Sequence, residues 1–376
     1  MHIAIQAADL DAERIDGTRV YIKQLLDRFG AIAPEEHFTL YHRTAFNPEL
    51  APKAFGNYRV RAIAQKFLWT QTRFAGALFR DKPDALWMPV QSLPIVRPKD
   101  MKTTVTIHDL AFHFFPDHFP LRDRIKLFAL ANAAITRSDR IIAVSENTKR
   151  DIIRLYPKIA PEKIAVVHHG YDGEMFAAGN GENDEAILKP LGLAGRRYLL
   201  YVGAIQPRKN LVRLIRAFEK LKKRDGFEDA MLVLAGERAW LWKEVLAAYE
   251  KSSERESIIL PGKVPFAHLG ALFRNAGIFV YPSLYEGFGL PVLEGFAAGV
   301  PVVCARGSSL DEVGGDAAVF FDPKSTDELA QKMEKALSDK TLRSTCIARG
   351  KKQLAKFSWD TCARETLSVI TNKKLS

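Results

Sequence analysis

Cysteine is scarce in this chain of 376 residues, which contains only Cys304, Cys346 and Cys362. Three scattered cysteines exclude a disulfide framework and fit no zinc-binding spacing. Long apolar runs are also missing, since no stretch approaches the roughly 18 uninterrupted apolar residues of a membrane-spanning helix. Residues 1–16 have no basic segment leading into a long apolar one, so we expect a first strand there and no signal peptide. A reducing cytoplasm is the simplest location.

Positive charge is what the chain has in excess. The formal net charge is +11, and both halves share it: residues 1–178 carry 25 Lys and Arg against 20 Asp and Glu, and the remainder carries 30 against 24. Such a surface suits anionic small molecules, phospholipid headgroups and nucleic acid alike. No nucleic-acid-binding module with interleaved aromatic residues accompanies the charge, which makes a nucleic-acid binder the weakest of these interpretations.

Short apolar runs alternate with amphipathic segments along the whole chain. Residues 2–7 predict a strand, residues 19–30 a helix that ends on glycine, and residues 66–79 a further helix. A polar, glycine-rich break at 177–186 interrupts the alternation, which then restarts. Strands alternating with helices are typical of parallel sheets covered on both faces.

The sequence therefore predicts an α/β protein built from two doubly wound, Rossmann-like domains. We place these domains at residues 1–180 and 186–357, with a last helix within 358–376 that can pack back on the first domain. Ligands of such sheets bind beyond the carboxyl ends of the strands. We accordingly expect the two domains to face a central cleft that holds the site.

The segment "YEGFGLPVLE", residues 285–294, follows an apolar strand and opens a helix. Proline is preorganised for the first turn of a helix, so the helix is expected to begin at Leu290–Pro291. Gly287 and Gly289 then lie just before a helix N-terminus, where free amides and the positive end of the helix dipole suit a phosphate group.

Two acids of the same segment have a different use. Glu286 lies in the loop and Glu294 about one turn into the helix. A carboxylate repels phosphate, but it accepts hydrogen bonds from two neighbouring sugar hydroxyls. A nucleoside diphosphate sugar, with one sugar on each side of a diphosphate, satisfies the whole segment. The simpler alternative is a solvated Glu286 and a Glu294 that only supports the helix.

A second strand–turn–helix segment carries cations that suit the same diphosphate. In "YVGAIQPRKN" Gly203 stands at the strand end, Arg208 and Lys209 follow Pro207, and Asn210 is a plausible N-cap. Adjacent cations can hold two phosphates and stabilise the charge of a departing diphosphate without a metal. The alternative is a pair of solvated cations before a helix.

The "PRKN" turn, the two glutamates with seven residues between them, and the order "LVLAG", "LPGKV", "LFRNAGIFVYPSLYEGFGLPVLE" resemble the retaining glycosyltransferases of family four, which have the GT-B fold. The resemblance covers nearly all of the second domain and is looser in the first. It implies transfer of a hexose from a nucleoside diphosphate sugar, GDP-mannose or a UDP-hexose, without cofactor or metal. The acceptor would be a saccharide or a lipid-linked saccharide, as in mannosyltransferases of bacterial surface polysaccharide synthesis.

The resemblance also assigns residue roles. Arg208 and Lys209 would hold the diphosphate, and Glu294 the ribose diol. The transferred sugar and its phosphate would be held by Glu286 and by the backbone of Gly287, Phe288, Gly289 and Leu290.

In the first domain the resemblance points to two further positions. His108, at a predicted strand end, would lie beside the reacting sugar, although a packed polar histidine is the alternative. Gly17 belongs to a loop that borders the donor phosphates in relatives; this chain has one glycine there where many have two. His108, His113, Asp117 and His118 fit no metal-ligand spacing, so we expect no metal.

The segment 66–79 mixes cations with Phe67, Leu68, Trp69, Phe74 and Phe79. Core packing of these aromatic and aliphatic residues is the favoured interpretation. Contact with an anionic membrane, at the inner face of the plasma membrane, is the alternative. A nucleotide-sugar epimerase of the same fold is the alternative enzyme, and it would form product with no acceptor present.

Overall fold

The computed structural model describes residues 1–65, 67–177 and 183–373. The chain forms two compact units. The first contains Met1–His113, Arg122–Gly170 and the residues from Phe357 on, and the second contains Phe114–Leu121 and Tyr171–Lys356. The predicted junction at 177–186 lies partly outside the described residues.

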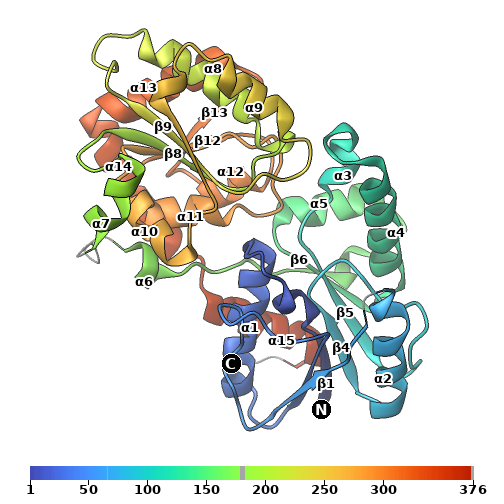
Figure 1. Ribbon diagram of the computed structural model, residues 1–376. Helices are drawn as coiled ribbons and strands as arrows, with labels where there is room; N and C mark the ends of the chain where they lie inside the picture. Colours follow the sequence, from blue (N-terminus) through green and yellow to red (C-terminus); the bar gives the residue numbers. More distant parts are fainter. Residues whose placement is uncertain (66, 178–182, 374–376) are drawn as a thin grey trace. The chain divides into compact units, whose positions relative to one another are not determined.

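A parallel sheet of seven strands, in the order β3-β2-β1-β4-β5-β6-β7, forms the first unit (Figure 1). Its strands are β1 (His2–Gln6), β2 (His37–His42), β3 (Tyr58–Ala62), β4 (Ala85–Met88), β5 (Lys102–Ile107), β6 (Arg140–Ala143) and β7 (Ile164–Val166). Its helices are α1 (Gly17–Ile32), α2 (Arg73–Asp81), α3 (Ala111–Phe114), α4 (Leu121–Arg137), α5 (Glu146–Leu155) and α15 (Trp359–Thr371). Short 3₁₀ turns of this unit are η1 (Ala8–Asp11), η2 (Trp69–Gln71) and η4 (Pro161–Lys163), whereas η3 (Pro116–His118), between α3 and α4 in the chain, belongs to the second unit.

A parallel sheet of six strands, in the order β10-β9-β8-β11-β12-β13, forms the second unit. Its strands are β8 (Tyr198–Val202), β9 (Met231–Ala235), β10 (Ile258–Gly262), β11 (Ile278–Tyr281), β12 (Val302–Ala305) and β13 (Val319–Phe321). Its helices are α6 (Gly173–Phe176), α7 (Asp184–Leu188), α8 (Leu211–Lys222), α9 (Lys243–Glu250), α10 (Phe266–Arg274), α11 (Leu290–Ala297), α12 (Ser309–Gly314), α13 (Thr326–Ser338) and α14 (Lys340–Leu354). Its 3₁₀ turns are η5 (Lys189–Leu191), η6 (Pro207–Lys209) and η7 (Arg255–Ser257).

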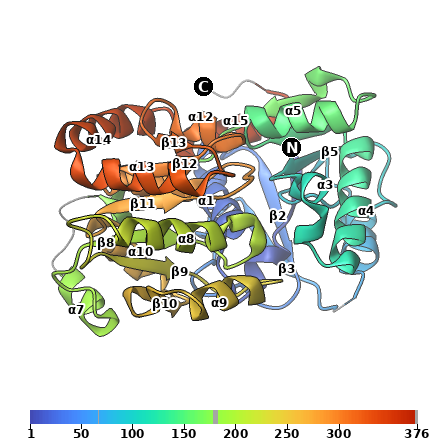
Figure 2. The ribbon, with the colours of Figure 1, turned by 90° about the horizontal axis from the view of Figure 1, so that it is seen from above.

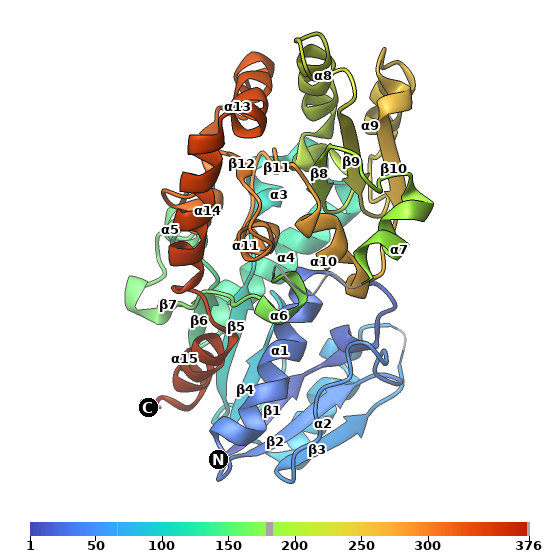
Figure 3. The ribbon, with the colours of Figure 1, turned by 90° about the vertical axis from the view of Figure 1, so that its left-hand side faces the viewer.

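Both sheets have helices on both faces, which confirms the predicted doubly wound architecture. In the second unit α8 packs beside α9 and α13 (Figure 2), and α11 packs against α12 and α14. In the first unit α15 packs against α1 and over β4, β5 and β6 (Figure 3). The last helix of the chain therefore packs on the first sheet, whose other elements come from the beginning of the sequence.

Two predicted helices differ from the observed ones. The helix predicted to end at Gly30 continues to Ile32, because Asn57 donates hydrogen bonds to the carbonyls of Gly30 and Ala33 at 3.2 and 3.0 Å and so satisfies the end of α1. Of the helix predicted for residues 66–79, Lys66 lies outside the described residues, and the remainder contains a 3₁₀ turn, η2, followed by α2. Leu68 adopts a left-handed conformation (φ 50°) that no α-helix continues through.

Core packing, the favoured expectation for the apolar residues of this segment, is only half right. Trp69 and Phe74 are buried and stack with ring centroids 4.8 Å apart, whereas Phe67 and Leu68 are 80% and 72% exposed.

Within the described parts of the chain, no helix is both long and apolar enough to cross a membrane.

The packing of α15 on the first unit gives a test of its contribution to stability. Leu367 is completely buried, so Leu367→Ala leaves a cavity and is expected to lower the free energy of unfolding of the first unit by roughly 2–5 kcal/mol. Hydrogen exchange should locate the loss of protection in α15, α1 and β4–β6. Thr361→Ala, at an exposed position of α15, is the control. Equal loss of protection in the second unit would contradict the assignment of α15.

Candidate functional site

The two turns singled out in the sequence meet at the reversal of strand order in the second sheet. β8 and β11 are neighbours there, although they are not consecutive in the chain. The turn with Gly203, Arg208 and Lys209 follows β8, and the loop with Glu286 follows β11. In open parallel sheets this reversal point, beyond the carboxyl ends of the strands, is where ligands bind.

Arg208, Lys209 and Glu286 form a buried ionic cluster at this point. Lys209 Nζ lies 2.5 Å from Glu286 Oε1, and Arg208 Nη1 lies 3.2 Å from Glu286 Oε2. Arg208 also donates to the carbonyl of Tyr285, and Lys209 donates to the Tyr281 hydroxyl at 3.0 Å. A pair of solvated cations, the alternative left open by the sequence, is therefore wrong.

The protonation state of Glu286 follows from these contacts. Burial alone would raise the pKa of its carboxyl, but Lys209 and Arg208 outweigh burial and lower the pKa to about 2. Glu286 is thus ionised at neutral pH, and the three side chains together carry one net positive charge. A buried cluster with surplus positive charge favours an anion beside it.

The loop that ends at Gly289 is held in place by residues of α12. The Ser309 hydroxyl, on α12, donates to the carbonyls of Glu286 and Phe288 at 2.8 and 2.7 Å. Gly289 has φ 112°, and a Cβ there would lie 2.6 Å from Leu310 Cδ2, so the position requires glycine. α11 then begins at Leu290 with Pro291 in its first turn, as predicted. Gly287, Phe288, Gly289 and Leu290 therefore lead directly into a helix N-terminus.

Gly203 lies at the end of β8, where its amide donates to the Ala235 carbonyl at 2.9 Å. It thus joins the turn after β8 to the end of β9. Asn210 occupies the N-cap position of α8, but its side chain donates to the carbonyls of Pro282 and Pro323 at 3.1 and 2.9 Å and does not cap the helix. The predicted capping bond is therefore wrong, and Asn210 instead joins its turn to the loop after β11.

Glu294 lies on α11, one helical turn beyond the glycine loop, and is partly exposed. Loss of hydration of the carboxylate within the protein, which is the larger cause, and the negative charge of the nearby Asp172 raise the pKa of this carboxyl to about 8. Asp172 caps α6 by accepting a hydrogen bond from the Met175 amide at 3.2 Å. The two glutamates of the segment therefore have opposite environments: the negative charge of Glu286 is balanced by two cations, whereas Glu294 has another acid near it.

Three side chains support the site through contacts that the sequence analysis does not predict. Tyr281 contacts Lys209, Ser309 holds the loop, and Asn210 connects the two turns. Tyr281 ends a predicted strand, which is a usable signal. Ser309 gives no such signal, because the fold alone brings α12 to the loop.

Residues 114–121 belong to the second unit, although the sequence places them in the first domain. The rings of Phe114 and Phe115 lie 5.5 and 6.1 Å from that of Tyr285, next to Glu286. Trp240 Nε1 donates to the His118 carbonyl at 2.7 Å. The sequence continues the first domain through these residues because their partners are remote in the chain.

His108 follows β5 in the first unit and is partly buried among aromatic rings. Its Nε2 lies 2.8 Å from the carbonyl oxygen of Pro89. A carbonyl only accepts, so Nε2 carries the proton and Nδ1 of the neutral ring is left as an acceptor. Burial lowers the pKa of His108, which favours this neutral form. Its position beside the reacting sugar stays a prediction.

Gly17 is the first residue of α1. The Asp16 carboxylate accepts from the Arg19 amide at 3.2 Å and forms an ion pair with the Arg19 side chain. An acid thus occupies this helix start, which does not favour a phosphate at the same amides. The role of Gly17 at the donor phosphates stays a prediction without local support.

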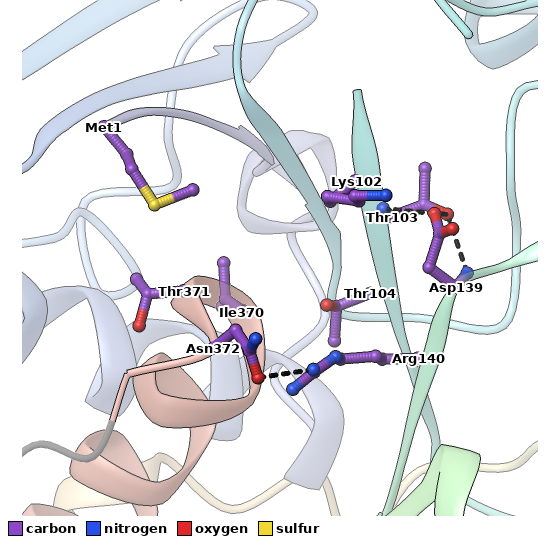
Figure 4. A pocket seen from close by; sticks show the side chains of 9 residues that line it. All are labelled: Met1, Lys102, Thr103, Thr104, Asp139, Arg140, Ile370, Thr371 and Asn372. Carbon is purple, nitrogen blue, oxygen red and sulfur yellow. Dashed lines mark hydrogen bonds between the residues drawn. The ribbon is translucent and has the colours of Figure 1, made fainter. Parts of the chain in front are cut away.

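A cavity of about 300 Å³ lies at the opposite, amino-terminal edge of the first sheet (Figure 4). It is lined by Met1, Lys102, Thr103, Thr104, Asp139, Arg140, Ile370, Thr371 and Asn372. Hydrogen bonds from Arg140 to Asn372 and between Thr103 and Asp139 hold its walls. Because β5 and β6 begin here, this cavity is not at the edge where the sequence places the site. Among the described residues, no group of three or more His, Cys, Asp or Glu is placed to hold a metal ion.

Two family models match most of the chain. Residues 183–353 match the model described as "Glycosyl transferases group 1", and residues 21–174 match "Glycosyltransferase Family 4". The O-antigen chain mannosyltransferase B of Escherichia coli is 33% identical over 272 residues, which are 71% of this chain and 69% of that protein. The serotype-specific mannosyltransferase WbdA of the same species is 26% identical over 91% of this chain, which spans 41% of WbdA.

Solved structures share the fold. HepE of Anabaena, determined in complex with UDP-glucose, superposes with a TM-score of 0.75 and 15% sequence identity, over 99% of this chain and 100% of HepE. At this identity the likeness shows a common GT-B architecture and no more.

The raised pKa of Glu294 gives a testable pH dependence. Between its ordinary pKa of 4.5 and about 8 the folded protein holds a proton that the unfolded chain releases, so this group costs stability as pH rises through that window. Glu294→Gln removes the cost. We expect the variant to gain stability over the wild type between pH 5 and pH 8, by on the order of 1–2 kcal/mol at the upper end after allowance for partial exposure.

Thermal melting of both proteins across this pH range measures the effect. Glu250→Gln, at an exposed position on α9, is the matched control and should follow the wild type at every pH. A pH-independent difference between Glu294→Gln and wild type would contradict the protonated form of Glu294.

Proposed function

Because this chain belongs to glycosyltransferase family 4, we propose that it transfers mannose from a nucleoside diphosphate sugar to a saccharide or lipid-linked saccharide, with retention of anomeric configuration. The observation that carries the proposal is the buried cluster of Arg208, Lys209 and Glu286 at the reversal of strand order. Mannose is proposed because the similar proteins of Escherichia coli are named as mannosyltransferases. GDP-mannose is the proposed donor, and a UDP-hexose is the next candidate.

The cations of the cluster suit a diphosphate. Arg208 is a planar fork that can bind two oxygens, and Lys209 is a point charge beside it. Both are buried, so their charges act in a medium that screens them less than water does. As the bond between the sugar carbon and the diphosphate breaks, negative charge grows on the departing oxygen, and the two cations stabilise it. In this proposal they take the place of a metal ion.

Glu286 has two roles in the proposal. Its ion pairs keep Arg208 and Lys209 in position before the donor binds. Each carboxylate oxygen also has a second lone pair, which can accept a hydrogen bond from a hydroxyl of the transferred sugar. The backbone from Gly287 to Leu290 would hold the adjoining phosphate at the start of α11.

Glu294 would bind the ribose of the nucleotide, since a carboxylate accepts from both hydroxyls of a diol. Its raised pKa in the free protein fits a group that is poorly solvated until a ligand supplies donors. In the transfer step the bond from the sugar carbon to the phosphate oxygen breaks and a bond to the acceptor oxygen forms on the same face. The acceptor proton passes to the departing phosphate oxygen, so no separate base is required.

The proposed setting is polysaccharide synthesis at the cytoplasmic face of a membrane. The name of the O-antigen chain mannosyltransferase supports a surface polysaccharide, and the net charge of +11 supports contact with an anionic bilayer. The named relatives are transferases, which supports transfer over the epimerase alternative.

A binding screen with EDTA present tests the donor assignment. We expect one of GDP, UDP, ADP and dTDP, with its common sugars, to bind with a micromolar dissociation constant in calorimetry and to raise the melting temperature. Binding that persists in EDTA supports a site without metal. The absence of binding by any nucleotide would contradict the proposal, and product formed without acceptor would favour the epimerase.

The cations are tested by substitution. Arg208→Ala or Lys209→Ala is expected to lower turnover by roughly 10²–10³, the scale of one transition-state charge contact. Arg216→Ala removes an exposed arginine from α8 in the same unit and is the matched control, with turnover unchanged. A loss below about threefold for both site variants would refute their assigned role.

A further inference from the structure

The cavity at the amino-terminal edge of the first sheet has no part in the candidate site described above. Its walls come from the amino ends of β5 and β6, from the end of α15 and from Met1, all of which belong to the first unit (Figure 4). His108, by contrast, follows the carboxyl end of β5. The volume of about 300 Å³ lies at the lower end of the range for pockets that hold small molecules. A small ligand therefore fits in this cavity, away from the reacting groups.

Thr104 gives the cavity a buried polar group without a partner. Its side chain is 3% exposed, and its hydroxyl forms no hydrogen bond with any of the described residues. Figure 4 shows the hydroxyl oxygen of Thr104 on the side that faces α15 across the cavity. A buried hydroxyl that lacks a hydrogen bond costs free energy, and a valine of the same shape would avoid this cost. The hydroxyl therefore indicates that something inside the cavity bonds to it.

Arg140, on the same wall as Thr104, keeps its charge. Its guanidinium donates to the Val369 carbonyl at 3.3 Å and to the Asn372 side-chain oxygen at 2.5 Å. Both acceptors are neutral, and in the described part of the chain no carboxylate pairs with this arginine. A guanidinium has five N–H groups in a planar fork, so further donors remain for a ligand.

Lys102 supplies a second cation at the start of β5. It is exposed, and its ammonium group forms no hydrogen bond or ion pair with the residues that the structure describes. Burial raises the pKa of Asp139, but hydrogen bonds from Thr103 and the charges of Lys102 and Arg97 outweigh burial and hold this pKa below its ordinary value. Asp139 is thus ionised at neutral pH. The lining side chains Lys102, Asp139 and Arg140 together carry one net positive charge.

Met1 and Ile370 provide the apolar part of the wall (Figure 4). Met1 is held in place because its amino group forms an ion pair with Glu36, and Lys373 pairs with the same carboxylate at 2.6 Å. The amino group is thus occupied by Glu36, and Met1 contributes its apolar side chain to the cavity.

We propose that this cavity binds a small organic anion that has one carboxylate group and a short apolar chain. The carboxylate would lie between Arg140 and Lys102, where the planar arginine fork matches its two oxygens, and it would accept a hydrogen bond from the Thr104 hydroxyl. The apolar chain would lie against Met1 and Ile370. A phosphate monoester fits less well, because it carries a larger negative charge than the lining balances and Asp139 repels it.

Two simpler interpretations explain less of the cavity. Arg140 stabilises the carboxyl end of α15, as cations do at such ends, but this role requires neither the Thr104 hydroxyl nor Lys102. Water alone could bond to Thr104, but it leaves the surplus positive charge of the lining without an anion. The ligand would instead connect β5 and β6 to the end of α15 and so hold this helix on the sheet.

Butyrate is the probe that tests the site, with butyramide as its uncharged analogue. In a ligand-observed NMR titration we expect butyrate to bind with a dissociation constant on the order of 1 mM, an ordinary affinity for a ligand of this size. Butyramide should bind at least roughly tenfold more weakly, because it lacks the charge that Arg140 and Lys102 attract. Bound butyrate should also slow hydrogen exchange at the end of α15.

Two substitutions locate the binding in this cavity. Thr104→Val keeps the shape of the side chain and should weaken butyrate binding by about tenfold, while stability without ligand is unchanged or higher. Lys102→Gln removes an exposed charge and should weaken binding by about threefold. Lys158→Gln removes another exposed lysine of the first unit, after α5, and is the matched control with unchanged affinity.

Four results would overturn the inference. Equal affinities for butyrate and butyramide would remove the role of the charge, and wild-type affinity in both Thr104→Val and Lys102→Gln would place the ligand elsewhere. Inorganic phosphate that binds more tightly than butyrate would refute the carboxylate. No binding at butyrate concentrations of roughly 50 mM would mean that water alone fills the cavity.

The inference does not depend on the proposed function. GDP and UDP binding, measured on the same variants, should equal that of the wild type, because Arg208, Lys209 and Glu286 belong to the second unit. A wild-type protein that binds butyrate but no nucleotide would contradict the proposed function and support the cavity. The reverse result would contradict only the cavity.

Discussion

The carboxylate of Glu286, buried between Arg208 and Lys209, is the contact that holds the candidate site of the second unit together. It joins the turn after β8 to the loop after β11, and these two segments are separated in the chain by β9 and β10. Removing one partner of such a buried cluster is costly, because the remaining charges have no water to solvate them. The same low screening would strengthen the attraction between the cluster's net positive charge and the phosphate that we propose binds beside it.

Two further side chains hold the loops that carry this cluster. Ser309 and Asn210 hold the two loops to α12 and to each other, so the cations are fixed before any ligand arrives. A site fixed in advance does not reorganise when charge develops in a transition state. Glu294, eight residues further along the chain, differs from Glu286 in that its pKa is raised and its charged neighbour is the acid Asp172. One short segment therefore offers an ionised and a protonated carboxyl at neutral pH.

Much of the local structure around the candidate site was predictable because its signals are local. Gly289 before Pro291, and the adjacent Arg208 and Lys209, each lie between a strand and the helix that follows it, and strand–turn–helix segments can be recognised over a dozen residues. The predictions failed where a remote partner decides the outcome. Asn57 donates to the carbonyls at the end of α1, past Gly30, and Gln71, in the segment where a helix was expected at 66–79, bonds to the backbone of Leu93 and Ile95. Residues 114–121 belong to the second unit because their partners Tyr285 and Trp240 lie far along the chain.

The sequence by itself determined the two parallel sheets, the turns at their carboxyl ends and the kinds of residue those turns carry, since periodicity and turn chemistry are local properties. Only the tertiary structure decided that Glu286 binds both cations, because no local rule fixes which of many charged residues will be buried together. It also decided that Phe67 and Leu68 face solvent while Trp69 and Phe74 do not. Burial depends on which elements pack against a segment, and in this chain those elements come from distant positions.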